Sequence, residues 1–250
     1  MHILLDIGNT RMKASTADKN GIHPTEQWQA LLPEAESVLV SNVAGKDAMP
    51  DAVVKHPQCR ILTWQSPEVG LWLKNVPAGL GADRVAADIG ARSMKPNNTL
   101  LIIDAGTCLT FDVIGKDGSV LGGAISPGIH LRLKAMHEHT AALPLLDACG
   151  EHPVLGYDTP TSMRSGAING MRWEIEGYIR HIRTLYPDLH VFFTGGDTTE
   201  FPKDLQQIIS CDLLLVQKGL LAAFGNKESD DLDCLKDSGY TDCPVHPDHL

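Results

Sequence analysis

The hydrophobic pattern of this chain repeats itself once. Apolar runs at residues 3–5 and 100–103 are each followed by Asp-x-Gly with a threonine close by, and then by a second strand-like stretch. These second stretches, residues 11–15 and 109–114, lead into turns rich in Asp, Lys and Gly. Two such hairpins in one chain predict a duplicated domain.

Strand and helix patterns alternate through the rest of the chain. Residues 37–41, 59–63 and 190–194 are predicted to form buried strands, and helices are predicted at 83–94, 166–185 and 213–224 with Gly225 as the last C-cap. Alternating strands and helices indicate an α/β fold, and the hairpins indicate that its sheets are mixed.

Composition narrows the class of protein. The chain has 250 residues, of which 43% are hydrophobic and 21% charged, so it can bury a substantial core. A formal net charge of -10 argues against general nucleic-acid binding and against an anionic membrane surface. Asp6 interrupts the only apolar run at the start, and no run is long enough to span a membrane. The six cysteines form no C-x-x-C pair, so we expect reduced thiols in a cytoplasmic protein.

Residues 226–250 form a segment of different character. They carry seven acidic residues and two lysines, without helical or strand periodicity. We expect a flexible acidic tail in which Cys234 and Cys243 are free thiols. A binding role for this tail stays open.

The first hairpin carries residues suited to binding phosphate. A carboxylate at a strand end, here Asp6, can hold hydrated Mg²⁺, and Gly8 permits close approach of the backbone to a phosphate. Thr10 can donate a hydrogen bond, and Lys13 adds positive charge. The alternative is a tight turn in which these residues serve only the backbone. The second copy, at Asp104, favours a pair of phosphate-binding hairpins.

Two further segments carry candidate chemistry. Asp83 opens a predicted helix, where it serves either as a cap or as a base that accepts a proton from a substrate hydroxyl. Arg84 could bind a substrate carboxylate. The Gly195-Gly196-Asp197 turn after a strand could accept an adenine or a ribose, or be a plain turn. The sequence contains no G-x-x-x-x-G-K-[ST] motif.

Taken together, these motifs resemble the type III pantothenate kinase family. The matching stretches, in order, are DIGNTRMK at 6–13, GADR at 81–84, DAGT at 104–107, GGAISPG at 122–128 and TPTSMRSG at 159–166. The resemblance covers residues 1 to about 224. It implies membership of the acetate and sugar kinase, Hsp70 and actin superfamily, with two ribonuclease-H-like domains, mixed β-sheets flanked by helices and an ATP cleft between them. The expected domains are 1–98 and 99–225, followed by the tail 226–250.

The same resemblance implies a function. We expect ATP-dependent phosphorylation of pantothenate to 4'-phosphopantothenate, the first step of coenzyme A biosynthesis, by a cytoplasmic homodimer that binds neither nucleic acid nor membrane. Two alternatives remain: another small-molecule kinase or a phosphatase of the superfamily, and a non-catalytic regulatory homologue acting as an accessory factor for transcription.

Residue roles follow from the resemblance, motif by motif. Asp83 is expected to be the catalytic base. The remaining expected roles are ATP binding by Asp6, Ile7, Gly8, Asn9, Thr10, Arg11, Met12, Lys13 and Thr107, pantothenate binding by Gly81, Ala82, Asp83, Arg84 and Thr159, Mg²⁺ binding with ATP by Asp6, and binding of a monovalent cation (K⁺ or NH4⁺) by Asp104.

Two positions depart from the family pattern. Lys74 stands where many members have tyrosine, and Arg164 stands where glutamine is usual, which puts one wall of the pantothenate pocket in question. The predicted helix 166–185 carries a core stripe and a second face with Met171 and Trp173, which we expect to support the homodimer.

Overall fold

The computed structural model describes residues 1–197 and 201–225, and these form two five-stranded sheets with helical layers. The elements of the first part are β1 His2–Ile7, β2 Met12–Asp18, β3 Gly21–Pro24, α1 Trp28–Leu31, β4 Ser37–Asn42, α2 Asp51–Val54, β5 Cys59–Leu62 and α3 Ala82–Met94, with short 3₁₀ turns at Leu32–Glu34, Lys46–Ala48 and Pro67–Leu71. Those of the second part are β6 Leu100–Ala105, β7 Cys108–Ile114, β8 Val120–Pro127, α4 Ile129–Glu138, α5 Thr159–Leu185, β9 His190–Gly195, α6 Lys203–Gln206, β10 Ile209–Cys211 and α7 Leu215–Phe224.

The two sheets have the same topology. Their strand orders are β3-β2-β1-β4-β5 and β8-β7-β6-β9-β10. In each sheet the first three strands pair antiparallel and the last two join them in parallel. The predicted duplication and the α/β class with mixed sheets flanked by helices are therefore confirmed.

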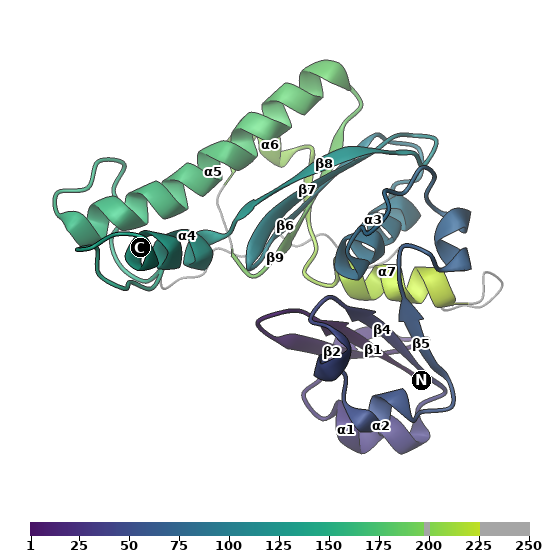
Figure 1. Cartoon of the computed structure of the whole chain (residues 1–250). Coiled ribbons are helices and arrows are strands. Elements are labelled where there is room, and N and C mark those ends of the chain that lie inside the picture. The colour runs from purple at the N-terminus through teal and green to yellow at the C-terminus, as the bar shows by residue number, and fades with distance from the viewer. Residues whose placement is uncertain (198–200, 226–250) are drawn as a thin grey trace.

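Five layers stack in the molecule (Figure 1). Helices α1 and α2 cover the outer face of the first sheet, α3 and α7 lie between the sheets, and α4, α5 and α6 cover the outer face of the second. Alternate residues of a strand serve different layers: Leu101 and Ile103 face α5, whereas Leu100 and Ile102 face the middle layer. The division at residue 98 stays a prediction, because the middle layer shares one core with both sheets.

The two middle helices touch through their backbones. A Cβ atom on Gly219 of α7 would lie 1.7 Å from the carbonyl oxygen of Ala86, and one on Gly90 of α3 would lie 2.4 Å from that of Leu215. Glycine is required at both positions, since any side chain would force the helices apart. This close crossing fixes α3, and therefore its first turn, relative to both sheets.

Differences from the sequence-based expectations concern short or irregular elements. Helix α5 begins at Thr159, before the expected 166, because Asp158 forms a capping box with Thr161 that precedes the apolar periodicity. Strand β8 was not expected, since Gly122, Gly123 and Pro127 weaken the strand pattern on this edge strand.

Further outcomes concern cysteines and membrane helices. Cys59, Cys108 and Cys149 are free, but Cys211 is disulfide-bonded, so the expectation of reduced thiols throughout is wrong. Within the described ranges, no helix combines the length and hydrophobicity that crossing a membrane requires. The expected tail 226–250, with its two cysteines, lies outside the described residues.

Candidate active site

The tips of the two hairpins meet between the sheets. The Thr10 and Thr107 hydroxyl oxygens lie 2.8 Å apart, within hydrogen-bond distance. Each hairpin carries an aspartate one residue before the end of its first strand: Asp6 pairs in register with Lys13, and Asp104 with Thr110. The duplicated topology thus brings two carboxylates from distant parts of the chain to one place.

These carboxylates share an electrostatic environment with Asp83 and Lys13. Burial raises the pKa of Asp6 to about 6; Lys13 opposes this rise, and the charges of Asp83 and Asp104 add to it. Burial likewise raises the pKa of Asp104 to about 6, again opposed by Lys13 and increased by Asp83. Hence Asp6, Asp83, Asp104 and Lys13 form one cluster, which we call the carboxylate cluster.

Asp83 is not the cap of α3. The N-cap position belongs to Gly81, and Asp83 is the second residue of the helix. Its Oδ1 accepts a hydrogen bond from the Arg84 backbone N–H at 2.8 Å and lies 2.6 Å from where a Cβ atom of Gly81 would be. The absence of a side chain at Gly81 therefore leaves room for the Asp83 carboxylate.

Arg84 is held by a residue that the motifs did not indicate. Its Nε and Nη2 atoms donate to the two carboxylate oxygens of Asp112 at 2.8 and 2.6 Å, so the pair is bidentate. The Asp112 side chain is 3% exposed. Pantothenate binding by Arg84 stays a prediction, with its guanidinium already oriented by this partner. An aspartate inside the apolar stretch 109–114 was the available signal.

Below this pair lies another acid, Asp88, one helical turn after Arg84. It is fully buried, and neither carboxylate oxygen has a hydrogen-bond partner in the described part of the chain. Burial and the charge of Asp112 raise its pKa well above the usual range, whereas Arg84 opposes the rise. Burial thus disfavours the charged form of Asp88.

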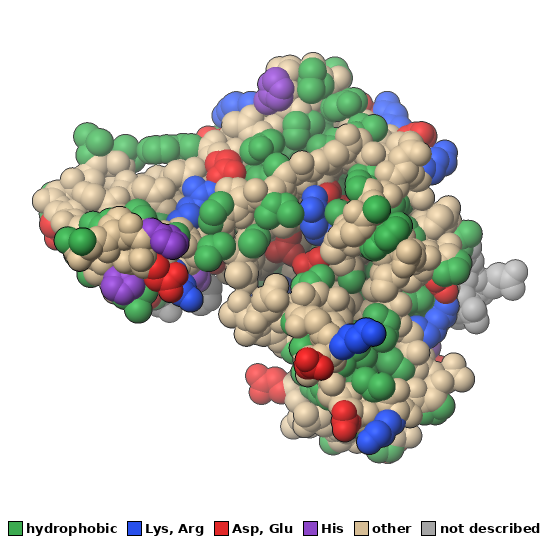
Figure 2. All heavy atoms as spheres, viewed as in Figure 1, with side chains coloured by type: hydrophobic (Ala, Val, Ile, Leu, Met, Phe, Trp, Pro, Cys, Tyr) green, Lys and Arg blue, Asp and Glu red, His purple; other side chains and the backbone are tan. Residues whose placement is uncertain are grey.

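An open cleft of about 920 Å³ adjoins the carboxylate cluster. Its lining includes Arg11 and Lys13 of the first hairpin and Gly195, Gly196 and Gln217 of the second half. A guanidinium nitrogen of Arg11 lies 2.3 Å from where a Cβ atom of Gly196 would be, so this side chain crosses from the first hairpin to the second sheet. Figure 2 shows acidic and basic side chains meeting in the hollow between the two parts of the molecule.

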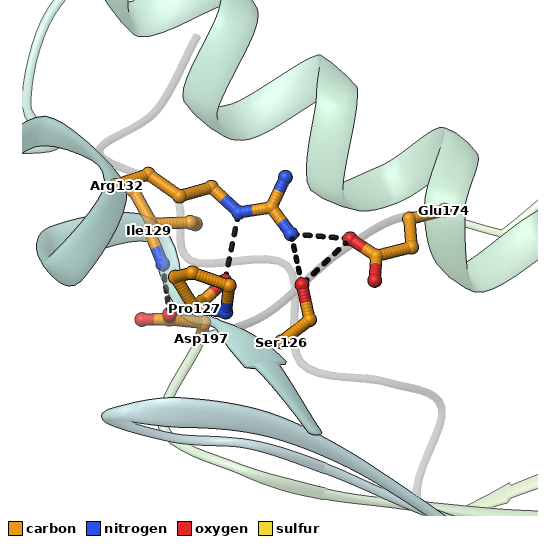
Figure 3. Close-up of polar contacts among 6 residues, drawn as sticks. All are labelled: Ser126, Pro127, Ile129, Arg132, Glu174 and Asp197. Carbon is orange, nitrogen blue, oxygen red and sulfur yellow. Dashed lines mark hydrogen bonds and ion pairs between the residues drawn. The ribbon is translucent and has the colours of Figure 1, made fainter. Parts of the chain in front are cut away.

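The start of α4 lies close to the second hairpin and is held by a polar network (Figure 3). The Ile129 N–H donates to the Asp197 carboxylate at 3.4 Å. Arg132 donates to the Pro127 carbonyl at 2.7 Å and to the Ser126 hydroxyl at 3.0 Å, and it forms an ion pair with Glu174 of α5. The GGAISPG motif thus ends in a rigid junction between β8, α4 and α5.

Thr159 lies elsewhere. It is the first residue of α5, which covers the outer face of the second sheet, whereas Asp83 begins α3 on the inner face. Thr159 lines a separate pocket of about 540 Å³ together with Met136, Tyr157 and Ser162. Within a single copy of the chain, Thr159 therefore does not lie in the carboxylate cluster.

The other predicted residues divide by exposure. Asn9, Thr10, Arg11, Met12 and Thr107 are exposed. In contrast, Ile7 and Ala82 are buried, so only their backbones are available to a ligand.

The two positions that depart from the family pattern are also placed. The backbone of Lys74 pairs with Gly118 and Val120, which leaves its side chain exposed. The Arg164 side chain contacts Asp147, where its Nε donates to the backbone carbonyl oxygen at 3.2 Å.

The donor set of the cluster fits hard cations. Asp6 and Asp104 offer carboxylate oxygens, the ligands that Mg²⁺ and K⁺ accept. No group of three or more His, Cys, Asp or Glu side chains suited to a metal occurs in the described residues. In proteins, Mg²⁺ is commonly held by one or two carboxylates and completed by nucleotide phosphates, and Asp6 and Asp104 offer such carboxylates.

The repeated sheet and the paired hairpins define the class as a duplicated α/β fold, with two mixed sheets of the same strand order flanked by helices. The family model for type III pantothenate kinase matches residues 2–181. A type III pantothenate kinase of Phocaeicola vulgatus is 38% identical over 232 residues, covering 88% of this chain and 96% of that protein. The corresponding protein of Bacteroides fragilis is 35% identical with the same coverage. The chain belongs to the type III pantothenate kinase family.

A solved structure supports the fold alone. It is named as a conserved Baf family transcriptional activator from Campylobacter jejuni and matches with a TM-score of 0.58 at 22% identity, covering 88% of this chain and 96% of that one.

Proposed function

We propose that this enzyme transfers the γ-phosphoryl group of ATP to the terminal hydroxyl of pantothenate, the first step of coenzyme A biosynthesis. One observation carries the proposal: in a member of this family, Asp83 lies at the start of α3 beside the two carboxylates of the paired hairpins. A regulatory homologue without catalysis is not favoured, because the chain has Asp6, Asp83 and Asp104 in one cluster.

The residues divide the reaction between them. The pantothenate hydroxyl oxygen attacks the γ-phosphorus, the bond between that phosphorus and the bridging oxygen of ADP breaks, and Asp83 accepts the hydroxyl proton. Lys13 balances the negative charge of the transferred group, and the Gly8 backbone admits a phosphate close to the hairpin. Since the transition state is loose, positioning contributes more than the basicity of Asp83.

Cation binding belongs to the proposal. We assign Mg²⁺ with ATP to Asp6 and a monovalent cation, K⁺ or NH4⁺, to Asp104. Such cations neutralise phosphate charge and would keep both carboxylates ionised at neutral pH. Without such cations, burial raises the pKa of each carboxylate to about 6, so the charged form of each is disfavoured in the fold.

The position of Thr159 supports a homodimer. A contact between Thr159 and pantothenate at Asp83 requires a second copy, because α5 and α3 lie on opposite faces of the second sheet. Large apolar side chains are exposed just before α5, with Leu155 at 86% and Tyr157 at 71%, and in the middle of α5, with Trp173 at 52%. Met171, expected on this outer face, is instead buried in the core at 1%.

The cellular setting is proposed on charge and chemistry. A net charge of -10 disfavours nucleic acid and anionic membranes as partners, and the substrates are small molecules of the cytoplasm.

The test is pantothenate-dependent ADP formation by the purified chain, with mass spectrometry of the product and with potassium present or absent. ADP formation that does not depend on pantothenate, or phosphorylation of another acceptor only, would remove the assignment. Sedimentation at micromolar concentration should give about twice 27.1 kDa. An active monomer would refute the shared pocket.

A further inference from the structure

Gln217 is a buried amide in the wall of the open cleft. It lies on α7, is 1% exposed and lines the cleft of about 920 Å³. Its amide oxygen is buried and has no hydrogen-bond partner among residues 1–197 and 201–225. A buried amide oxygen without a partner costs stability, so its retention calls for a physical reason.

The surroundings of Gln217 offer no polar compensation on its own helix face. Leu213 and Leu214, one turn earlier, also line the cleft, as does the Gly195-Gly196 turn. The basic side chains of Arg11 and Lys13 line the same cleft. A ligand that combines anionic groups with a flat, largely apolar part carrying a few polar edge atoms fits this set of lining residues.

We propose that Gln217 binds the edge of the adenine of ATP and so contributes to nucleotide choice. This inference rests on the proposed function, because it requires ATP in the cleft. A primary amide presents one acceptor and one donor group, and adenine presents the complementary 6-amino donor beside a ring-nitrogen acceptor. The phosphates would then extend from this part of the cleft toward Lys13 and the carboxylate cluster.

Two measurements on one variant distinguish a ligand-binding role of Gln217 from a structural role: the melting temperature and the affinity for ATP. Gln217→Leu removes the amide and keeps a similar volume, so the melting temperature should stay equal or rise, since an unsatisfied polar group is lost. ATP affinity should fall about three- to tenfold, as expected for one or two hydrogen bonds. A side chain that serves only the fold would show the reverse pattern.

The experiment measures binding by calorimetry, independently of turnover. ATP is compared with purine riboside triphosphate, which lacks the 6-amino group. The parent should prefer ATP about three- to tenfold, and Gln217→Leu should bind the two nucleotides within about twofold of each other. Gln206→Leu, a change on α6 outside the cleft lining, is the matched control and should keep the parental preference.

Each outcome decides the question. Parental preference retained in Gln217→Leu would overturn the assignment of Gln217 while leaving the kinase proposal intact. Should that variant fail to fold, Gln217→Met keeps a similar length and removes both the acceptor and the donor, so it should also lose the preference for ATP. A parent that binds ATP with its preference but forms no ADP with pantothenate would refute the proposed function and leave this inference standing.

Discussion

The two hairpins are alike in topology and unlike in charge. Each places an aspartate at the end of the first strand of an equivalent sheet, yet the residue paired with Asp6 is Lys13 whereas the one paired with Asp104 is Thr110. Lys13 nevertheless lowers the pKa of both carboxylates. A duplicated fold thus supplies two similar acids, and one lysine from the first copy serves both.

The outer layers of the two halves differ more strongly. Helices α1 and α2, with four residues each, cover the first sheet, whereas α5, with 27, crosses the second. The exposed apolar side chains before and along α5 lie on the second half. The halves therefore share the reaction centre, and the second half alone carries the proposed interface.

The largest effect should come from Asp83, whose charge acts on the aspartates of both hairpins. Asp83→Asn keeps an acceptor for the Arg84 N–H but removes the proton acceptor, so turnover should fall by roughly 10²–10⁴. Melting temperature and ATP affinity should stay near the parental values. Asp117→Asn, at an exposed turn, is the control. Turnover within about threefold of the parent would place the base elsewhere.

A second test compares Asp6 and Asp104 by stability. Their pKa values of about 6 in the fold exceed the ordinary 3.8, so the native state retains protons that the unfolded chain releases. Stability should therefore fall as the pH rises from about 4 to 6 and level off above. At pH 7, Asp6→Asn or Asp104→Asn should raise the free energy of unfolding by about 3 kcal/mol in buffer free of Mg²⁺ and potassium.

A second measurement on the same two variants is the dependence of turnover on each cation. Asp104→Asn should also lose potassium stimulation of turnover, whereas Asp6→Asn should chiefly weaken the dependence on Mg²⁺. Denaturation midpoints at about pH 4 and pH 7 measure the first effect. Equal stability of parent and variants at both pH values would show that the carboxylates are not strained.

The third test removes Lys13, the lysine that only the first hairpin carries. Lys13→Met removes the positive charge that both acids share, so both pKa values should rise further and KM for ATP should increase about tenfold. Lys19→Met, in the turn at the far end of the same hairpin, should change neither. An unaltered KM in Lys13→Met would mean that phosphate contacts come mainly from backbone groups.

Much of this architecture is predictable because its signals are local. The Asp-x-Gly hairpins and the strands at 37–41 and 190–194 follow from short apolar runs, and the duplication follows from comparing two of them. Long-range partners are not predictable in this way. The Arg84–Asp112 pair joins residues whose proximity depends on the crossing of α3 over the second sheet.

Site prediction shows the same limit. Asp6, Asp83 and Asp104 were found by motif and lie together, whereas Thr159 matched a motif and lies on the other face of the sheet. Gln217 had no motif, because nothing in an apolar helix pattern distinguishes a polar residue that lines a cleft from one that faces solvent. The hydrophobic periodicity of a sequence does not show which residues meet a second copy of the chain or line a cavity.

The smallest effect should come from the contact between the hairpin tips. Thr10→Val and Thr107→Val each remove one hydroxyl of the hydrogen bond that joins the two halves. A double-mutant cycle on unfolding free energy should give a coupling of about 0.5–1 kcal/mol, and KM for ATP should rise only about twofold. Thr16→Val, whose hydroxyl donates to the His23 carbonyl within the first sheet, should show no coupling to Thr107→Val. Strict additivity of Thr10→Val and Thr107→Val would mean that the tips are held by the sheets and helices alone, and that the hairpins meet without depending on each other.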